Sequence, residues 1–290
     1  MKGIYSALIG CFDECGRPNL KAFGDAVDYN INVSGVDGLY VNGSTGESFN
    51  MPLEDRKRVL SAVAERNNGR ISLIAQVGCN VVEEIYELAD EAARCGYDAI
   101  SAVAPFYYVY TKDEIKTHYR RIAERSKLPL VIYNIPVRTN VVLNQADFRE
   151  LLSIPNIAGV KFTSQDMFLL EQIRSDFPNA TIFNGFDEFL LAGLTTGADG
   201  AIGTTYNISG RFAKEVYAAV QASDIAAGRK AQRKENEVVK MLLDAGIFQT
   251  IKAAMELEGV ACGSPRLPQS PINETHIEAA KKILEYIKNN

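Results

Sequence analysis

Histidine is scarce in this sequence, with only His118 and His276 among 290 residues. Both lie in segments whose hydrophobic pattern predicts helices, and neither stands at a spacing typical of metal ligands. A structural zinc site and a Ser-His-Asp triad both place histidine beside partner groups in a set geometry. We therefore expect neither a metal centre nor a triad, and we interpret both histidines as surface or packing residues.

Cysteine is also sparse, and the five copies include no CxxC pair. An odd number of scattered cysteines is typical of free thiols in a reducing compartment. The first ten residues, MKGIYSALIG, lack the long apolar region and small-residue cleavage site of a secretory signal. We expect a cytoplasmic protein. The cysteines are Cys11, Cys15, Cys79, Cys95 and Cys262.

Three further absences narrow the functional class. The net charge is -5, and nucleic-acid binding depends on a basic surface, so we expect no nucleic-acid partner. No apolar run reaches the roughly 18 residues of a membrane span, so we expect no membrane partner. The GxxxxGK[ST] spacing of a phosphate-binding loop is missing as well. A hydrophobic content of 47% with 23% charged residues is that of a globular protein with a large core.

Eight short apolar runs alternate with longer segments of helical period. Their hydrophobicity is continuous, which indicates parallel strands buried on both faces. A doubly wound sheet gives the same local pattern but usually has fewer strands. Eight strand–helix units favour an α/β protein with a (β/α)₈ barrel (TIM barrel). The expected strands are Ile4–Ile9, Gly38–Val41, Ile71–Gln76, Ala99–Val103, Leu130–Tyr133, Ala158–Lys161, Thr181–Asn184 and Gly200–Gly203.

The chain becomes entirely helical from about Ser209 onward. A barrel of this type takes about 250 residues, so additional C-terminal helices remain after the barrel is closed. We expect a single domain over residues 1–290, with the barrel at about 1–222 and a helical extension at about 223–290. Asn19 and Gly96 stand where residues of their type begin and end helices.

Catalytic groups of such barrels lie at the carboxyl ends of the strands. The run IAGVK ends in Lys161 there, and a lysine that extends a buried strand is costly unless its amine has a use. One use is attack on a carbonyl to form an imine, which requires the neutral amine that an ordinary lysine rarely supplies at pH 7. The alternative is a lysine whose stem lines the rim while its head reaches water.

Tyr133 ends the preceding run, LPLVIY, and adjacent strand ends place it within hydrogen-bond reach of Lys161. Its phenol would relay a proton between substrate and solvent, or else its ring only packs at the rim. Ser44 and Thr45 lie in NGSTGE, whose glycines expose backbone N–H groups suited to a carboxylate. The alternative is an ordinary strand-to-helix turn.

Two carboxylates, Asp187 and Glu188, follow the seventh expected strand in NGFDE. Side chains of this kind would accept hydrogen bonds from a polyhydroxylated substrate. The alternative is that they only add favourable negative charge at a helix N-terminus. The tyrosine-rich stretch PFYYVY, residues 105–110, follows the fourth expected strand. Its aromatic side chains could belong to the core, to a subunit interface or to the site.

Together GSTGE, YNIP, GVKFTSQD, NGFDE and GAIGTTYN resemble the N-acetylneuraminate lyase group of class I, Schiff-base pyruvate lyases, a family that includes dihydrodipicolinate synthase. The likeness runs from about residue 3 to the C-terminus. It implies a (β/α)₈ barrel, usually a homotetramer, with no metal or organic cofactor. It also implies reversible cleavage of N-acetylneuraminate to N-acetylmannosamine and pyruvate.

The resemblance assigns roles to single residues. It implies the imine on Lys161, the proton-shuttling phenol of Tyr133, and a pyruvate carboxylate held by Ser44 and Thr45. Tyr107 matches a tyrosine that many members present across a subunit interface. The positions that match contacts to the sugar-derived part of the substrate are Thr163, Gly185, Asp187, Glu188 and Thr204.

The chain departs from the family's patterns at two informative places. Arg138 and Thr139 stand where dihydrodipicolinate synthases carry an RTG triplet, whose glycine is Asn140 here. Thr204 replaces a commoner serine. The alternative functions are therefore dihydrodipicolinate synthase or another pyruvate-dependent 2-keto-3-deoxy sugar acid aldolase. A catalytically inactive keto-acid sensor and a structural interaction protein are the rivals from other classes.

Overall fold

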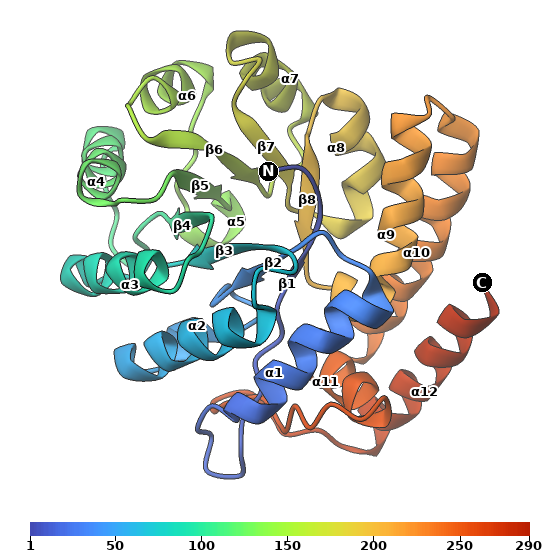
Figure 1. Cartoon of the computed structure of the whole chain (residues 1–290). Coiled ribbons are helices and arrows are strands. Elements are labelled where there is room, and N and C mark those ends of the chain that lie inside the picture. Colours follow the sequence, from blue (N-terminus) through green and yellow to red (C-terminus); the bar gives the residue numbers. More distant parts are fainter.

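The computed structural model describes all 290 residues and shows a closed barrel in which each strand pairs in parallel with the next and β8 pairs with β1 (Figure 1). The predicted (β/α)₈ fold with additional C-terminal helices is confirmed. The strands are β1 (Gly3–Ala7), β2 (Gly38–Val41), β3 (Ser72–Gln76), β4 (Ala99–Val103), β5 (Leu130–Asn134), β6 (Ile157–Phe162), β7 (Thr181–Asn184) and β8 (Gly200–Gly203).

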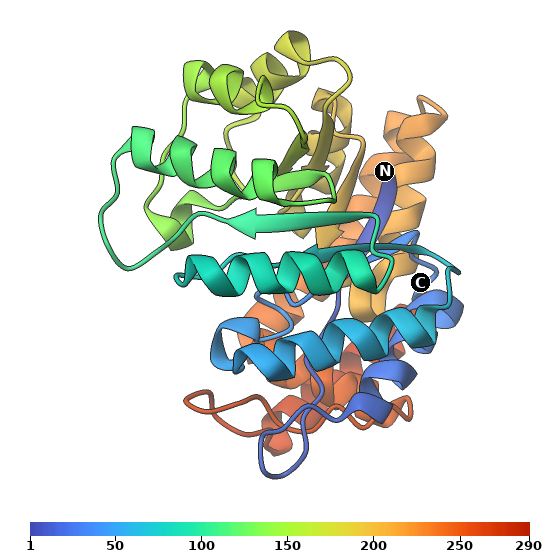
Figure 2. The same cartoon turned by 60° about the vertical axis from the view of Figure 1, so that its left-hand side comes forward.

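Helices follow the strands and cover the outside of the barrel, as Figure 2 shows from the side. They are α1 (Leu20–Tyr29), α2 (Leu53–Asn67), α3 (Val82–Arg94), α4 (Lys112–Arg125), α5 (Pro136–Thr139), α6 (Gln145–Leu152), α7 (Met167–Asp176), α8 (Leu190–Thr196), α9 (Tyr206–Gln221), α10 (Ile225–Ala245), α11 (Ile247–Leu257) and α12 (Glu274–Asn289). Short helical turns are η1 (Asn30–Ser34), η2 (Ser48–Asn50) and η3 (Asp187–Phe189).

Two hydrophobic cores lie on the two faces of the strands. Successive strand residues point to opposite faces, so on β2 Tyr40 belongs to the cluster inside the barrel, while Leu39 and Val41 belong to the cluster under the helices. The side chains of both clusters are buried from water. The continuous hydrophobicity of the strands follows from this burial on both sides.

Some helices and strands begin or end at residues other than those predicted, and each difference has a local cause. Asn19 caps α1 as predicted, because its side chain accepts a hydrogen bond from the N–H of Ala22. The first strand ends at Ala7 rather than Ile9, whose N–H donates to the Asn207 side chain instead of a neighbouring strand. The unforeseen one-turn helix α5 begins at Pro136, a residue preorganised for the first helical position.

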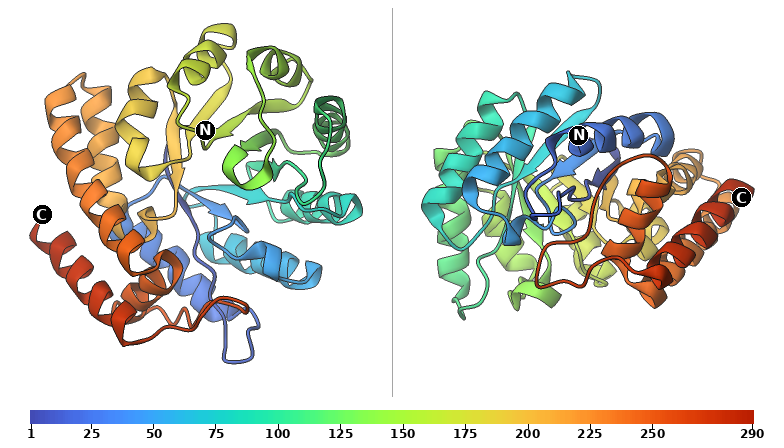
Figure 3. Two further views of the ribbon diagram at one scale, coloured as in Figure 1. Left: turned by 180° about the vertical axis from the view of Figure 1, so that it is seen from behind. Right: turned by 90° about the horizontal axis from the view of Figure 1, so that it is seen from below.

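The helices α9 to α12 stack at one side of the barrel, beside α8 (Figures 1 and 3). Helix α10 lies along α9 and also contacts η3, while α11 packs against α12. None of the helices is both long and apolar enough to cross a membrane. The extension therefore adds a layer on one side of the barrel and reaches the loop after β7.

A buried ion pair joins the extension to the loop that follows β2. The Lys252 Nζ atom of α11 lies 2.9 Å from the Glu47 Oε1 atom, and the two side chains are 0% and 1% exposed. The Glu47 Oε2 atom accepts hydrogen bonds from the N–H of Arg266 at 2.7 Å and from the Gln269 side chain at 3.2 Å. Glu47 has φ 55°, a left-handed conformation that is uncommon for residues with a side chain. These contacts from the C-terminal segment hold the loop in its shape.

We predict that Lys252→Met destabilises the protein by about 3–5 kcal/mol, because it leaves the Glu47 charge buried without a partner. The matched control is Lys281→Met, which removes the Lys281–Glu278 pair whose side chains are 56% and 61% exposed. Loss of that exposed pair changes stability by at most about 1 kcal/mol. Urea titrations followed by circular dichroism measure both variants. Equal unfolding free energies for the two would contradict the proposed role of the buried pair.

Candidate active site

Lys161 lies inside the barrel at the carboxyl end of β6. Its backbone is in register with Tyr133 on β5 and with Phe183 on β7, so three inward side chains meet at one level. The lysine is only 4% exposed, and no carboxylate lies within ion-pair distance of its amine. A buried lysine without a counter-charge is rare in protein interiors, and it marks this end of the barrel as the candidate active site.

Two aromatic rings enclose the lysine amine. The Lys161 Nζ atom lies 4.2 Å from the centre of the Tyr133 ring and 4.4 Å from the centre of the Tyr40 ring. The contact with Tyr133 is with the ring face, and no hydrogen bond joins the two side chains. Tyr40 was missed by the sequence analysis, although its place in GLYV, directly before the predicted loop, is the signal that would have pointed to it. Its hydroxyl donates to the Ser101 Oγ atom at 3.0 Å, which fixes the ring.

The NGSTGE loop lies beside the strand-eight end of the barrel. Ser44 is exposed and Thr45 is buried, and the Thr45 hydroxyl lies 2.7 Å from the hydroxyl of Thr204. The Thr45 carbonyl accepts the N–H of Gly10, which ties the loop to the segment after β1. The structure thus brings together Thr45 and Thr204, two predicted site residues from motifs far apart in the sequence.

Thr163 and Gly185, which follow β6 and β7, are in close contact. A Cβ atom at Gly185 would overlap the Thr163 Oγ1 atom, so only glycine fits at this position. The Thr163 hydroxyl is enclosed and has no hydrogen-bond partner within the chain. A buried hydroxyl with an unused donor is available to a ligand, because unpaired buried polar groups are costly.

Asp187 is buried at the start of η3, and its Oδ2 atom accepts hydrogen bonds from the Thr205 N–H at 2.9 Å and from the Thr205 hydroxyl at 2.7 Å. Burial raises the pKa of Asp187 to about 6, and the nearby Glu188 charge adds to the effect, while the Thr205 hydrogen bonds and Lys161 oppose it. Glu188 itself is half-buried. Of these residues, Thr205 was missed, although it follows the predicted Thr204 directly.

Other predicted residues lie apart from this group. Tyr107 is 87% exposed on the loop after β4, with φ 84°, and its ring packs on Tyr108. Arg138 is exposed on α5 and pairs with no carboxylate of the chain. Asn140 ends α5 with φ 56°, and asparagine adopts this left-handed conformation more readily than most residues, which explains how it stands in place of glycine.

The two histidines lie outside the barrel interior. His118 packs against Tyr119 on α4, and burial lowers its pKa to about 4. His276 caps α12, where its Nδ1 atom accepts the N–H of Asn273. No group of three or more His, Cys, Asp or Glu side chains is arranged to hold a metal ion.

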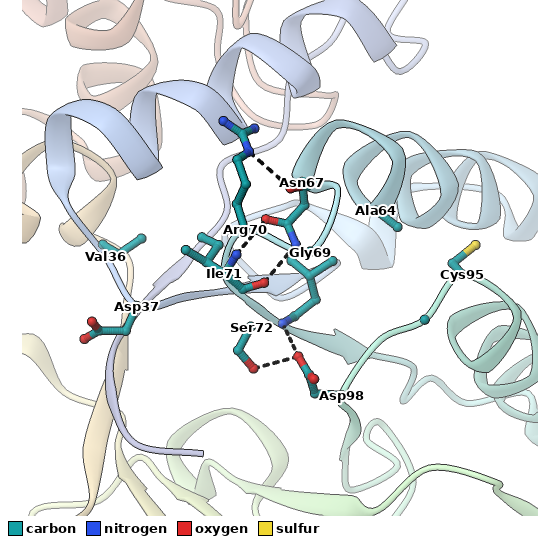
Figure 4. A pocket seen from close by; sticks show the side chains of 12 residues that line it. Val36, Asp37, Ala64, Asn67, Gly69, Arg70, Ile71, Ser72, Cys95 and Asp98 are labelled. Carbon is teal, nitrogen blue, oxygen red and sulfur yellow. Dashed lines mark hydrogen bonds between the residues drawn. The ribbon is translucent and has the colours of Figure 1, made fainter.

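A separate open pocket lies at the amino ends of the strands, opposite Lys161 (Figure 4). Several of its polar groups already have hydrogen-bond partners within the chain. Ser72 donates to the Asp98 carboxylate at 2.7 Å, and Arg70 donates to the Asn67 carbonyl at 3.1 Å and to the Asp28 carboxylate at 2.6 Å. In barrels of this type the amino end serves stability, while chemistry occurs at the carboxyl end.

Comparisons with known proteins identify relatives over the whole length of the chain. An N-acetylneuraminate lyase from Clostridium perfringens is 42% identical over 283 residues, which are 98% of this chain and 98% of that protein. The crystal structure of CdNal from Clostridium difficile in complex with mannosamine is 41% identical, with a TM-score of 0.96 and 98% of each chain covered. An N-acetylneuraminate lyase from Fusobacterium nucleatum complexed with pyruvate is also 41% identical, with a TM-score of 0.94, and the match covers 99% of this chain and 97% of that one.

The family comparison agrees with these relatives. Residues 1–287 match the model of the dihydrodipicolinate synthetase family. The match leaves out only the last turn of α12, and so it includes the barrel, the site and the C-terminal helices. The chain belongs to the dihydrodipicolinate synthetase family.

Proposed function

We propose that this protein is a Schiff-base aldolase that cleaves N-acetylneuraminate reversibly to N-acetylmannosamine and pyruvate. The observation that carries the proposal is the Lys161 amine, buried at the carboxyl end of β6 between two tyrosine rings and without a carboxylate partner. Relatives at about 42% identity are named N-acetylneuraminate lyases. Pyruvate and mannosamine, the molecules in the complexes of two similar structures, correspond to the two halves of this substrate.

The reaction begins when the neutral Lys161 amine attacks the keto carbon of the open-chain sugar acid. Loss of water gives a protonated imine, which accepts the electron pair of the bond between the α and β carbons as that bond breaks, so that an enamine forms. Tyr133 takes the proton of the hydroxyl that becomes the aldehyde, and N-acetylmannosamine leaves. The remaining enamine is protonated on carbon, and water hydrolyses the imine to release pyruvate and the free lysine. No step requires a metal or an organic cofactor.

The residues around the lysine divide between the two halves of the substrate. Ser44 and Thr45 hold the pyruvate carboxylate, whereas the N–H of Gly46 is already donated to the Gly43 carbonyl within the loop. The opposite side of the opening has the free hydroxyl of Thr163 and the carboxylates that accept hydrogen bonds from sugar hydroxyls. The side chains proposed to contact the sugar-derived part are Thr163, Asp187, Glu188 and Thr204, together with the backbone of Gly185.

Arg138 favours a second candidate reaction. Its exposed and unpaired guanidinium on α5 suits a substrate with a second carboxylate. Condensation of pyruvate with aspartate semialdehyde, the dihydrodipicolinate synthase reaction, uses the same imine, as do aldolases that act on other 2-keto-3-deoxy sugar acids.

We also propose a homotetramer in which Tyr107 contributes to the site of a neighbouring subunit. The loop after β4 exposes Tyr107, Tyr108 and Val109, which are 87%, 69% and 101% accessible. An apolar patch of this kind marks an interaction surface. The positive φ of Tyr107 is strained for a residue with a bulky side chain, and such strain clusters at functional positions. The cytoplasmic location stays a prediction from the sequence.

Reduction of the imine tests the nucleophile. Borohydride treatment with pyruvate present is expected to attach the pyruvate carbons to Lys161, because reduction makes the carbon–nitrogen bond permanent. Peptide mass mapping identifies the modified residue. Lys161→Met is expected to take up no adduct, whereas Lys281→Met, which changes an exposed lysine, is expected to react fully. An adduct on another lysine of the wild type would overturn the mechanism.

The Tyr133 hydroxyl is tested by Tyr133→Phe, which keeps the ring beside Lys161 and removes the proton carrier. We expect kcat for cleavage to fall by about 10²–10⁴-fold, while borohydride trapping with pyruvate persists. Tyr217→Phe on α9 is the matched control and is expected to keep its kcat. An unchanged kcat in Tyr133→Phe would assign the proton transfer to another group.

The substrate is tested by two assays on the same preparation. Pyruvate release from N-acetylneuraminate is expected to exceed condensation of pyruvate with aspartate semialdehyde, because hydroxyl and carboxylate side chains surround the sugar-binding side. Arg138→Gln is expected to leave the first activity intact. Activity only in the aspartate semialdehyde assay would show that N-acetylneuraminate is not the substrate. No turnover in either assay would favour a catalytically inactive keto-acid sensor.

A further inference from the structure

A second carboxyl group lies behind Asp187, on the C-terminal helix α10. Glu235 is 0% exposed and forms no ion pair. Its Oε1 atom lies 2.5 Å from the Thr205 hydroxyl and 2.9 Å from the Ser209 hydroxyl, and its Oε2 atom has no partner. A fully buried ionised carboxylate with no cation is very costly, so this group needs another explanation.

The explanation comes from the number of hydrogens shared between the Thr205 hydroxyl and the two carboxyl groups beside it. The Thr205 hydroxyl lies between two carboxyl oxygens, at 2.7 Å from Asp187 Oδ2 and at 2.5 Å from Glu235 Oε1. It has a single hydrogen and can donate to only one of them. If both carboxyls were ionised, the other contact would set lone pairs against each other at hydrogen-bond distance. One of the two carboxyls therefore carries a proton and donates it to Thr205.

The surroundings assign this proton to Glu235. The Asp187 Oδ2 atom accepts a backbone N–H from Thr205, and Lys161 is close enough to favour its charged form. Glu235 has neither a backbone donor nor a cation, and burial raises its pKa to about 8, above that of Asp187 at about 6. The Ser209 hydroxyl has a second acceptor, the Thr205 carbonyl at 3.0 Å, so it does not need to donate to Glu235.

We propose that Glu235 is a protonated positioning residue whose carboxylic acid donates to Thr205, which in turn donates to Asp187 Oδ2, so that helix α10 fixes the carboxylate that faces the substrate. The inference rests on the proposed function in one respect, namely that Asp187 contacts the sugar-derived half. The Asp187 Oδ1 atom keeps no partner within the chain and points toward Gly203, where a side chain would overlap it. Oδ1 is thus left to accept a substrate hydroxyl.

Helix α10 also holds the backbone of the same turn. The Gln232 side chain, one turn before Glu235, donates to the Asp187 carbonyl at 3.1 Å and accepts the N–H of Leu191 at 2.7 Å. Two consecutive turns of α10 therefore support Asp187: Gln232 binds its backbone directly, and Glu235 acts on its carboxylate through Thr205.

Few charged groups face this cluster. Asp187 of η3 and Tyr206 of α9 are the titratable neighbours of Glu235, and Glu188 and Lys161 act on Asp187. Helices α8, α11 and α12 contribute no hydrogen bond or ion pair to the Glu235 carboxyl. Ionisation of Glu235 removes the donor to Thr205 and adds a second negative charge behind Asp187. The expected result is weaker binding of the sugar acid as the pH rises through about 8.

The kinetic test compares Glu235→Leu, Glu235→Gln and the matched control Glu237→Gln, which changes an exposed residue of the same helix. Cleavage of N-acetylneuraminate is measured from pH 6 to pH 9.5. We expect Glu235→Leu to raise KM about fivefold at pH 7, the effect of losing one neutral hydrogen bond behind Asp187. Borohydride trapping with pyruvate, which does not use Asp187, is expected to remain unchanged.

Glu235→Gln keeps a donor without an ionisable proton. It is expected to restore most of the affinity that Glu235→Leu loses, and to lack the rise in KM above pH 8 that the wild type and Glu237→Gln show. An alkaline rise that persists in Glu235→Gln would overturn the proposal. If Glu235→Leu does not fold, the comparison of Glu235→Gln with the wild type decides the question.

A thermal test works without any substrate and separates this proposal from the proposed function. An unfolded glutamate loses its proton near pH 4.3, whereas folded Glu235 keeps it to about pH 8. The wild type therefore loses stability as the pH rises between these values. The Tm of Glu235→Gln minus that of the wild type is expected to grow from pH 5 to pH 8 and then level off, while the difference for Glu237→Gln stays flat. A flat difference for Glu235→Gln would show that Glu235 is ionised in the folded protein.

Discussion

The burial of an amine without a counter-charge is the constraint on which the rest of this site depends. Placing Lys161 inside a closed barrel requires that its neighbours on the adjoining strands be large enough to exclude water and free of negative charge. Tyr133 and Phe183 meet this requirement from the two flanking strands, and Tyr40 does so from across the barrel. The carboxylates of the region stand further out, at the start of η3 and behind it. Negative charge is thereby available to substrate hydroxyls without forming an ion pair with the nucleophile.

The C-terminal helices support this opening from outside. Helix α11 reaches the loop after β2 through the Lys252–Glu47 pair, and helix α10 reaches the turn after β7 through Gln232 and Thr205 after β8 through Glu235. In the proposed function these two loops contact opposite halves of the substrate. The extension therefore contacts the loops around Lys161 as well as covering one side of the barrel.

Much of the fold was predictable because its signals are local. Eight apolar runs, each buried on two faces, mark the strands, and Asn19 marks a helix start through its own side chain. Lys161 was predictable as well, because a lysine that extends an apolar run conflicts with its surroundings. The residue-level roles in the site came from the motifs and from the family resemblance. They remain proposals, although the structure brings Thr45 and Thr204 into contact.

The features that escaped prediction are contacts between residues far apart in the sequence. Glu235 looks like an ordinary charged residue of a polar helix, and only the fold brings it against Thr205, thirty positions earlier. In the sequence, Tyr40 does not differ from other aromatic residues of strands. Only the closed barrel places the Lys161 amine of β6 over its ring. The helix α5 was missed because four residues are too few to show a helical period.

The Glu47–Lys252 contact also bears on when the protein becomes competent during its synthesis. The loop after β2 is made within the first fifty residues, yet the residue that neutralises Glu47 is added only when more than four fifths of the chain exists. A nascent chain in which all eight strands have emerged still carries an unpaired acid at the base of that loop. The contacts that hold the loop after β2 are therefore complete only once the chain has been made as far as Gln269, after α11.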